Sequence, residues 1–195
     1  MLQDSLKNIE IILASGSPRR HKFFEELEIP VTIDVRPVDE VFPESLKKKE
    51  ITDYLAKLKA SAFKDLKENQ VLITSDTIVY NDGKAMGKPN SREEAIQMIE
   101  SLSGKAHEVI TSVCFTTSEK QLVLNNTTKV FFSELEKEEI QFYVDKYKPY
   151  DKAGGYAIQE WIGLIGIEKI EGSYFNVVGL PTHLVYRTLK KLANS

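Results

Sequence analysis

Residues 9–20 read Ile-Glu-Ile-Ile-Leu-Ala-Ser-Gly-Ser-Pro-Arg-Arg, and this stretch decides the fold class. The mostly apolar run from 9 to 14 ends at Ser-Gly-Ser-Pro, which predicts a buried strand that leads into a turn. A helix should follow, because Ser17 is a good N-cap and Pro18 suits the first helical position. Strand, turn and helix in this order are typical of the start of an α/β fold.

Apolar periodicity and capping signals extend this pattern along the chain. In the first helix Phe23, Phe24 and Leu27 should face a core, whereas His21 should point outward. Strands are expected at 31–35, 71–80, twice within 106–132 and at 163–170. Helices are expected at 51–66, 91–102, 133–147 and after 181, two of them opened by capping boxes at 91–94 and 133–136.

Helices and strands alternate in the N-terminal half of the sequence, and two consecutive strands are expected within 106–132. We therefore predict an α/β fold with a mixed β-sheet and flanking helices. No linker-like segment divides the sequence, which favours a single domain over 1–195.

The composition excludes several classes of protein. The 195 residues carry 26 Lys+Arg and 29 Asp+Glu, a net charge of -3, which argues against stable binding to a nucleic-acid backbone or an anionic membrane. The only cysteine, Cys114, lies in a strand-like run and permits neither an intramolecular disulfide nor a cysteine-based zinc site. No apolar run resembles a signal peptide or a membrane span, so a cytoplasmic location is expected.

The turn after the first strand is a candidate phosphate-binding site. Ser15 and Ser17 supply hydroxyls, Arg19 and Arg20 supply guanidinium groups, and the backbone N–H groups at the start of a helix attract anions. The same residues are equally compatible with a capped helix whose arginines face solvent.

Asp76 is the strongest candidate for a catalytic residue. It interrupts an apolar strand, where a buried charge is costly unless a metal, a base or a substrate meets it. An Asp that starts a turn or bonds to backbone is the alternative. Glu40 and Asp39 could supply further carboxylate oxygens for a hard cation such as Mg²⁺, and the alternative is that this pair is only loop surface. The three histidines, which lack the spacing of metal ligands or of a catalytic triad, are expected to be structural.

Taken together, these segments resemble the Maf family of nucleoside triphosphate pyrophosphatases over nearly the whole chain. The matching segments are 12–20, 55–60, Ser75-Asp76-Thr77, Gly87-Lys88-Pro89, 102–107, Asp151-Lys152-Ala153-Gly154 and 172–181. The resemblance implies a Maf/ITPase-like fold with two lobes around a central cleft. It further implies cleavage of a nucleoside triphosphate into monophosphate and pyrophosphate with Mg²⁺ or Mn²⁺, in a homodimer.

The resemblance also implies roles for individual residues. Asp76 matches the proton acceptor that would activate water. Arg19, Thr77 and Gln159 match the dTTP/UTP pyrophosphatase subfamily at three positions where another subfamily has Trp, Gln and Glu. The remaining assignments are phosphate binding by Ser15, Ser17, Arg20, Lys59 and Lys88, and metal binding by Glu40 and Asp76.

A chemical argument supports the assignment of Gln159. An amide can both donate to and accept from the edge of uracil or thymine, whereas a carboxylate can only accept. Ala157 and Glu160-Trp161 depart from the commoner family pattern beside this position.

Two other functions are compatible with parts of the sequence. Leu-Ala-x-Gly-x-x-x-Arg after a first strand also opens sugar-phosphate nucleotidyltransferases, which need a second substrate. A non-hydrolytic nucleotide-binding regulator of septum formation is the non-enzyme alternative, against which the retained Asp76 argues.

Overall fold

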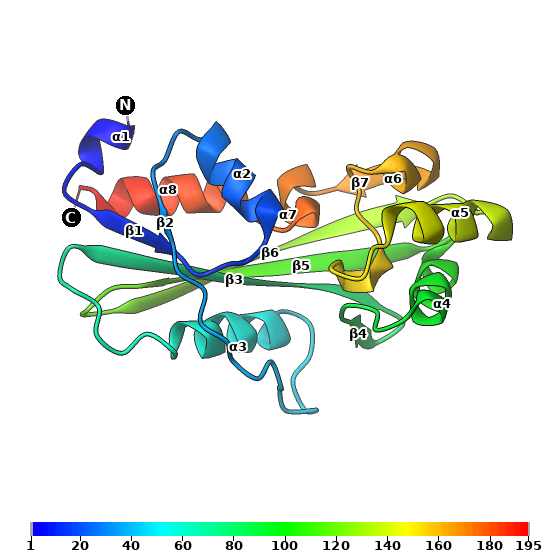
Figure 1. Ribbon diagram of the computed structural model, residues 1–195, viewed down its shortest axis with the longest axis horizontal. Coiled ribbons are helices and arrows are strands. Elements are labelled where there is room, and N and C mark those ends of the chain that lie inside the picture. The colour runs from blue at the N-terminus through cyan, green and yellow to red at the C-terminus, as the bar shows by residue number, and fades with distance from the viewer. Residues whose placement is uncertain (1, 195) are drawn as a thin grey trace. The chain divides into compact units, whose positions relative to one another are not determined.

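The computed structural model describes residues 2–194. Its strands are hydrogen-bonded in the order β2 (Thr32–Ile33), β1 (Glu10–Leu13), β3 (Gln70–Asn81), β5 (Ala106–Thr116), β6 (Gln121–Phe132) and β7 (Ile167–Glu171), and β4 (Lys84–Met86) pairs with β3. β1 runs parallel to β2 and β3, whereas β4 and β7 run antiparallel to their partners. The mixed sheet with flanking helices confirms the predicted fold class (Figure 1). Within the described residues no helix is long and apolar enough to cross a membrane.

The chain forms two compact units, each built from separate segments of sequence. The first unit comprises 1–76, 111–126 and 179–195, and the second comprises 77–110 and 127–178. Three of the boundaries therefore fall inside or beside the long strands β3, β5 and β6. The two lobes of the sequence analysis correspond to these units, and the cleft and the single domain over 1–195 stay predictions.

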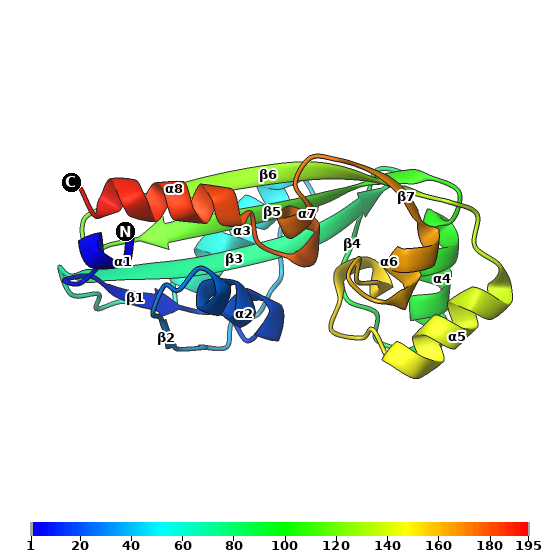
Figure 2. The same ribbon diagram turned by 90° about the horizontal axis from the view of Figure 1, so that it is seen from above.

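The first unit holds the predicted phosphate-binding turn. Its elements are α1 (Leu2–Ser5), β1 (Glu10–Leu13), α2 (Pro18–Glu26), β2 (Thr32–Ile33), α3 (Lys49–Ala60), α8 (Thr182–Leu192), and parts of β3 (Gln70–Asn81), β5 (Ala106–Thr116) and β6 (Gln121–Phe132). In this unit α2 and α8 lie on one side of the strands and α3 lies on the other (Figures 1 and 2). Leu13, Phe24, Leu72 and Leu189 are fully buried there.

The second unit packs its helices around one large apolar cluster. Its elements are the rest of β3, β5 and β6, with β4 (Lys84–Met86), α4 (Arg92–Leu102), α5 (Lys137–Tyr147), η1 (Ala153–Gly155), α6 (Trp161–Gly166), β7 (Ile167–Glu171) and α7 (Tyr174–Val178). Figure 2 shows α4, α5 and α6 gathered together. Their cluster includes Ile99, Tyr143, Ile158 and Ile162.

Several predicted elements differ from the structure. The strand expected at 31–35 is only Thr32–Ile33, because it pairs only with Ile12 and Leu13 of the short β1. The helix expected to reach 66 ends at Ala60, since the chain then turns so that Phe63 packs in the core beside Ile12 and Leu72.

Two further predictions about the second unit are wrong. The capping box of α5 is formed by Glu136 and Glu139 rather than by residues 133–136, because Glu136 lies at the helix N-terminus and the two side chains bond reciprocally. The segment 163–170 was expected to be one strand, but α6 covers its first part and β7 starts only at Ile167.

Candidate active site

The turn between β1 and α2 is fixed by hydrogen bonds to Ser15. As predicted, Pro18 opens the helix behind Ser17, although the Ser17 side chain makes no capping hydrogen bond. The buried Ser15 hydroxyl instead accepts from the Ser17 amide and from Arg20 Nη1, both at 3.3 Å. His21 was expected to face outward, but its Nε2 lies 2.5 Å from the Ser15 carbonyl oxygen, so this part of the prediction is wrong.

Arg20 is held by backbone carbonyl groups from two distant segments. Its Nε donates to Gly179 at 2.8 Å and its Nη1 donates to Ser75 at 2.9 Å. Desolvation lowers the pKa of Arg20 to about 10, with a further reduction from Arg19 that Asp76 and Glu40 oppose. The guanidinium remains a cation at neutral pH and adds positive charge beside Asp76.

Asp76 lies inside β3 and is only 6 % exposed, which confirms the prediction of a buried carboxylate in a strand. Its Oδ1 lies 2.6 Å from the ammonium of Lys59, which also lies 3.0 Å from Glu40 Oε2. Burial raises the pKa of Asp76, while the charges of Lys59 and Arg20 act in the opposite direction. A carboxylate whose pKa is raised is a stronger proton acceptor than an exposed one.

The helix that carries Lys59 is anchored by buried polar contacts. Thr74, two residues before Asp76, donates a hydrogen bond to the Ala56 carbonyl group at 2.7 Å. On the same helix Asp53 accepts from Ser112 at 2.6 Å and from Asn125 at 3.2 Å. These contacts hold α3 against the strands and therefore place the backbone of Lys59 beside β3. This cluster was not predicted from the sequence, because its members lie on four elements and form no motif.

Three of the predicted site residues belong to the second unit. Thr77 follows Asp76 directly in β3 and is partly exposed, whereas Lys88 and Gln159 are exposed. The loop before Lys88 is held in place because the Gly154 amide donates to the Gly87 carbonyl group at 2.9 Å. Within this unit the Gly-Lys-Pro loop and the Asp-Lys-Ala-Gly segment therefore lie side by side.

Lys152 has no role predicted from the sequence, and the structure buries it. Its side chain is 9 % exposed, and its Nζ pairs with Asp151 at 2.7 Å and with Glu160 at 3.4 Å. A buried lysine needs such partners because an unpaired charge in a protein interior is costly. The sequence offered one sign of this pairing, because Asp151 precedes Lys152 directly and Glu160 follows it eight positions later.

A divalent cation would find hard oxygen donors at Asp76 and Glu40, both of which the structure gathers around one ammonium. Among residues 2–194 no cluster of three or more His, Cys, Asp or Glu side chains is arranged to hold a metal ion. Mg²⁺ commonly takes one or two carboxylates from the protein and completes its shell with water and substrate phosphates. The two carboxylates fit that partial ligand set.

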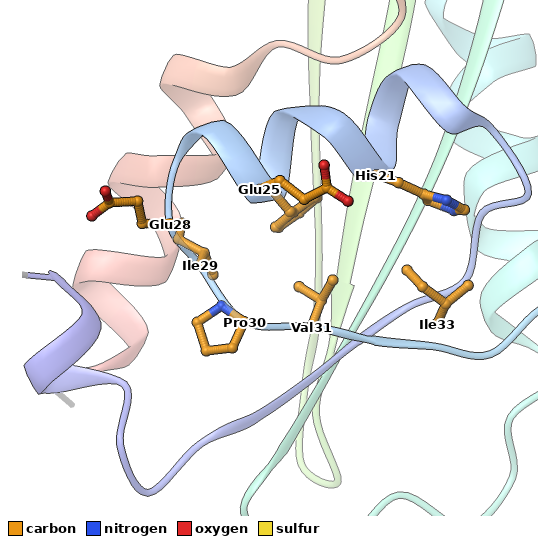
Figure 3. A pocket seen from close by; sticks show the side chains of 8 residues that line it. His21, Glu25, Glu28, Ile29, Pro30, Val31 and Ile33 are labelled. Carbon is orange, nitrogen blue, oxygen red and sulfur yellow. The ribbon is translucent and has the colours of Figure 1, made fainter.

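A pocket of about 440 Å³ lies beside α2 in the first unit, between the helix and the extended segment that follows it (Figure 3). Its lining includes Glu25, Glu28, Ile29 and Val31 but not Asp76. Two carboxylates would repel a triphosphate, so this pocket is unsuited to nucleotide phosphates.

The fold resembles that of Ham1 proteins. The Ham1 protein of Staphylococcus aureus matches with a TM-score of 0.51 and 15% identity, covering 94% of this chain and 99% of that one. The HAM1 protein of Coxiella burnetii matches with a TM-score of 0.52 and 14% identity over the same shares. At these identities the likeness shows the fold alone.

Sequence relationships define the family. Residues 10–192 match the family described as Maf-like protein. The chain is 72% identical to a dTTP/UTP pyrophosphatase of Christiangramia forsetii over the full length of both chains. It is 54% identical to a dTTP/UTP pyrophosphatase of Flavobacterium johnsoniae, over 98% of this chain and 100% of the relative. The chain therefore belongs to the Maf family, which confirms the family predicted from its motifs.

Proposed function

We propose that this protein is a nucleoside triphosphate pyrophosphatase that hydrolyses dTTP and UTP to the monophosphate and pyrophosphate. The observation that carries the proposal is the buried Asp76 carboxylate, paired with Lys59 and close to Arg20, in a chain that closely matches relatives named dTTP/UTP pyrophosphatase. The class of reaction and the pyrimidine substrates come to this chain from those relatives.

The proposed chemistry is an attack of water on the α phosphorus. Asp76 accepts a proton from the water, the new oxygen–phosphorus bond forms, and the bond from the α phosphorus to the bridging oxygen breaks. Pyrophosphate leaves with the electron pair of that bond. Arg19, Arg20, Lys59 and Lys88 are proposed to neutralise the phosphate charge, with Ser15 and Ser17 as hydrogen-bond donors.

Asp76 and Glu40 are the proposed ligands of a divalent cation, either Mg²⁺ or Mn²⁺. When bound, the ion would supply positive charge to the phosphate oxygens. We also propose that the enzyme acts in the cytoplasm as a homodimer. Light scattering of the purified protein tests the oligomeric state, and hydrolysis assays with each metal alone test the cofactor.

The decisive variant is Asp76→Asn, which keeps the shape of the side chain and removes its basicity. We expect kcat for UTP to fall about 100-fold or more, the usual range for loss of a general base, while UTP still binds. The exposed Asp65 provides the control, since Asp65→Asn should leave kcat unchanged. Wild-type kcat in the Asp76→Asn variant would refute the proposed mechanism.

The identity of the products separates the proposed reaction from its rivals. A pyrophosphatase releases pyrophosphate from UTP with water as the only acceptor, whereas a nucleotidyltransferase stays inactive until a second substrate is added. A purely binding regulator would retain UTP without releasing pyrophosphate. Assays that score pyrophosphate against phosphate in a panel of nucleoside triphosphates distinguish these three outcomes.

A further inference from the structure

Residues 157–160 form a four-residue turn that carries Gln159 at its third position. The Glu160 amide donates to the Ala157 carbonyl group at 3.0 Å and closes the turn. Ile158 is buried in the apolar cluster of the second unit, whereas Gln159 is exposed. The turn thus has an anchored side chain directly before the one proposed to read the base.

One phenol joins the two ends of this turn. The hydroxyl group of Tyr143 donates to Glu160 Oε2 at 2.5 Å, and the Tyr143 hydroxyl oxygen itself accepts from the Ala157 amide at 3.1 Å. Tyr143 is fully buried in α5, where its ring stacks on Tyr147 at 5.1 Å between centroids. A rigid ring therefore fixes both the first and the last residue of the turn.

The other carboxylate oxygen of Glu160 is also occupied. Glu160 Oε1 lies 3.4 Å from the buried ammonium of Lys152, so the carboxylate cannot turn away without leaving a buried charge poorly compensated. The turn also lies close to Gly163, where a Cβ atom would come within 1.8 Å of the Ile158 carbonyl oxygen. Contacts from α5, Lys152 and α6 therefore restrain the same four residues.

We infer that Tyr143 and Glu160 are positioning residues for base selection, which clamp the 157–160 turn so that the Gln159 amide is presented in one orientation. The inference rests on the proposed function, because it assumes that Gln159 reads a pyrimidine base. A side chain that discriminates by hydrogen-bond geometry needs this kind of support, since a mobile amide can adapt to either pattern of donors and acceptors. Glu160, which departs from the commoner family pattern, supplies part of the clamp in this chain.

The clamp itself can be tested without any substrate. Tyr143→Phe removes the hydroxyl group and both of its hydrogen bonds but keeps the ring. We expect hydrogen exchange of the Ala157 amide, followed by NMR, to become about 10-fold faster or more as its protection is lost. Tyr147→Phe is the matched control, because it removes a phenol from the adjacent ring of the same helix and should leave Ala157 protected. Unchanged Ala157 exchange in Tyr143→Phe would refute the clamp.

The role in selectivity needs a double-mutant cycle. In the chain with Gln159, Tyr143→Phe should lower the ratio of kcat/KM for UTP to kcat/KM for GTP about 10-fold. In the Gln159→Ala background the same substitution should leave that ratio unchanged within about 2-fold. Equal losses in both backgrounds, or no loss in either, would overturn the inference, because a merely structural role does not depend on Gln159.

A second pair of variants keeps the test open if Tyr143→Phe does not fold. Glu160→Ala removes the acceptor and should lower the UTP-to-GTP ratio. Glu160→Gln retains an acceptor for the phenol, although it removes the charge that faces Lys152, and should therefore lower the ratio less than Glu160→Ala. Equal losses in the two variants would refute the clamp. A wild-type protein that shows protected Ala157 but releases no pyrophosphate from UTP would instead refute the proposed function, and the role in selectivity with it.

Discussion

At the scale of single residues, the ammonium of Lys59 between Asp76 and Glu40 is the central feature of the candidate site. The sequence analysis assigned this lysine to the phosphates and the two carboxylates to a metal. In the structure Lys59 compensates both carboxylates, so a cation that bridged them would have to displace its ammonium. Both assignments stay predictions, and they become mutually consistent if Lys59 moves toward the triphosphate when a metal binds.

Some residues of the candidate site could be predicted from the sequence, and others could not. Asp76 was identified because a charged residue inside an apolar strand is unusual, and the structure confirms its burial. The pairing of Lys59 with Asp76 could not be read from the sequence, since it depends on how α3 packs against β3. The role of Tyr143 was hidden for the same reason, because a tyrosine at a helical core position signals packing and not a bond to a distant turn.

Gln159→Glu tests the proposed base reader directly. The substitution replaces an amide that donates and accepts by a carboxylate that only accepts, so a hydrogen bond to the pyrimidine edge is lost. We expect kcat/KM for UTP and dTTP to fall about 10- to 100-fold and that for GTP to fall less. Steady-state kinetics with the three nucleotides measure the difference, and equal losses for all of them would remove this role from Gln159.

At the scale of elements, the strongly patterned segments were predicted well in type, whereas short elements and some boundaries, such as the C-terminal end of α3, were not. The helix after Pro18, the strand through Asp76 and the hairpin formed by β5 and β6 all lie where their patterns placed them. The apolar run that contains α6 was ambiguous, because periodicity does not separate a short helix from a strand. Periodicity also does not reveal the close packing at two of its glycines, where a Cβ atom would come within 1.8 Å of the Ile158 carbonyl oxygen at Gly163 and within 3.0 Å of Leu135 at Gly166.

Gly154 allows a prediction about how η1 is held in place. Its φ is +70°, and a Cβ atom there would lie 2.7 Å from Val79 Cγ2. Gly83 also has a positive φ, of +80°, but a Cβ atom there would meet nothing within 4 Å. Gly83→Ala should therefore cost only the strain of the left-handed conformation, about 1 kcal/mol. Gly154→Ala should cost about 1–3 kcal/mol more through overpacking.

Urea unfolding of both glycine variants measures these differences. A loss of stability in Gly154→Ala no larger than that in Gly83→Ala would show that Val79 moves aside readily. Because Gly154 also donates to Gly87, Gly154→Ala should in addition loosen the loop that carries Lys88. Faster hydrogen exchange of the amide at position 154 in the variant than in the wild type would report that change.

At the scale of the whole molecule, His107 links stability to pH. It is 3 % exposed, its Nε2 lies 2.7 Å from the Tyr156 hydroxyl oxygen, and burial lowers its pKa from 6.5 to about 4. Between pH 6.5 and 4 the unfolded chain therefore binds a proton at His107 that the folded chain does not. The free energy of unfolding should decrease as the pH falls through this window, by up to about 3 kcal/mol from this group.

His107→Gln isolates this contribution, because the amide can still bond to Tyr156 but does not titrate in this range. Urea unfolding at several pH values should show a weaker decrease between pH 6.5 and 4 in the variant than in the wild type. Above pH 7 the pH dependence of the two proteins should be parallel. Identical pH dependence at acidic pH would mean that His107 becomes protonated in the folded protein without cost.

The division of the two units along the chain sets the order in which they are completed during synthesis. All segments of the second unit end by residue 178, whereas the first unit is complete only with 179–195. That last segment contributes Val185 and Leu189, both fully buried, and the Gly179 carbonyl group that holds Arg20. The unit that carries Asp76 is therefore completed later in synthesis than the second unit, and a nascent chain that stops at residue 178 holds every segment of the second unit but an incomplete first unit.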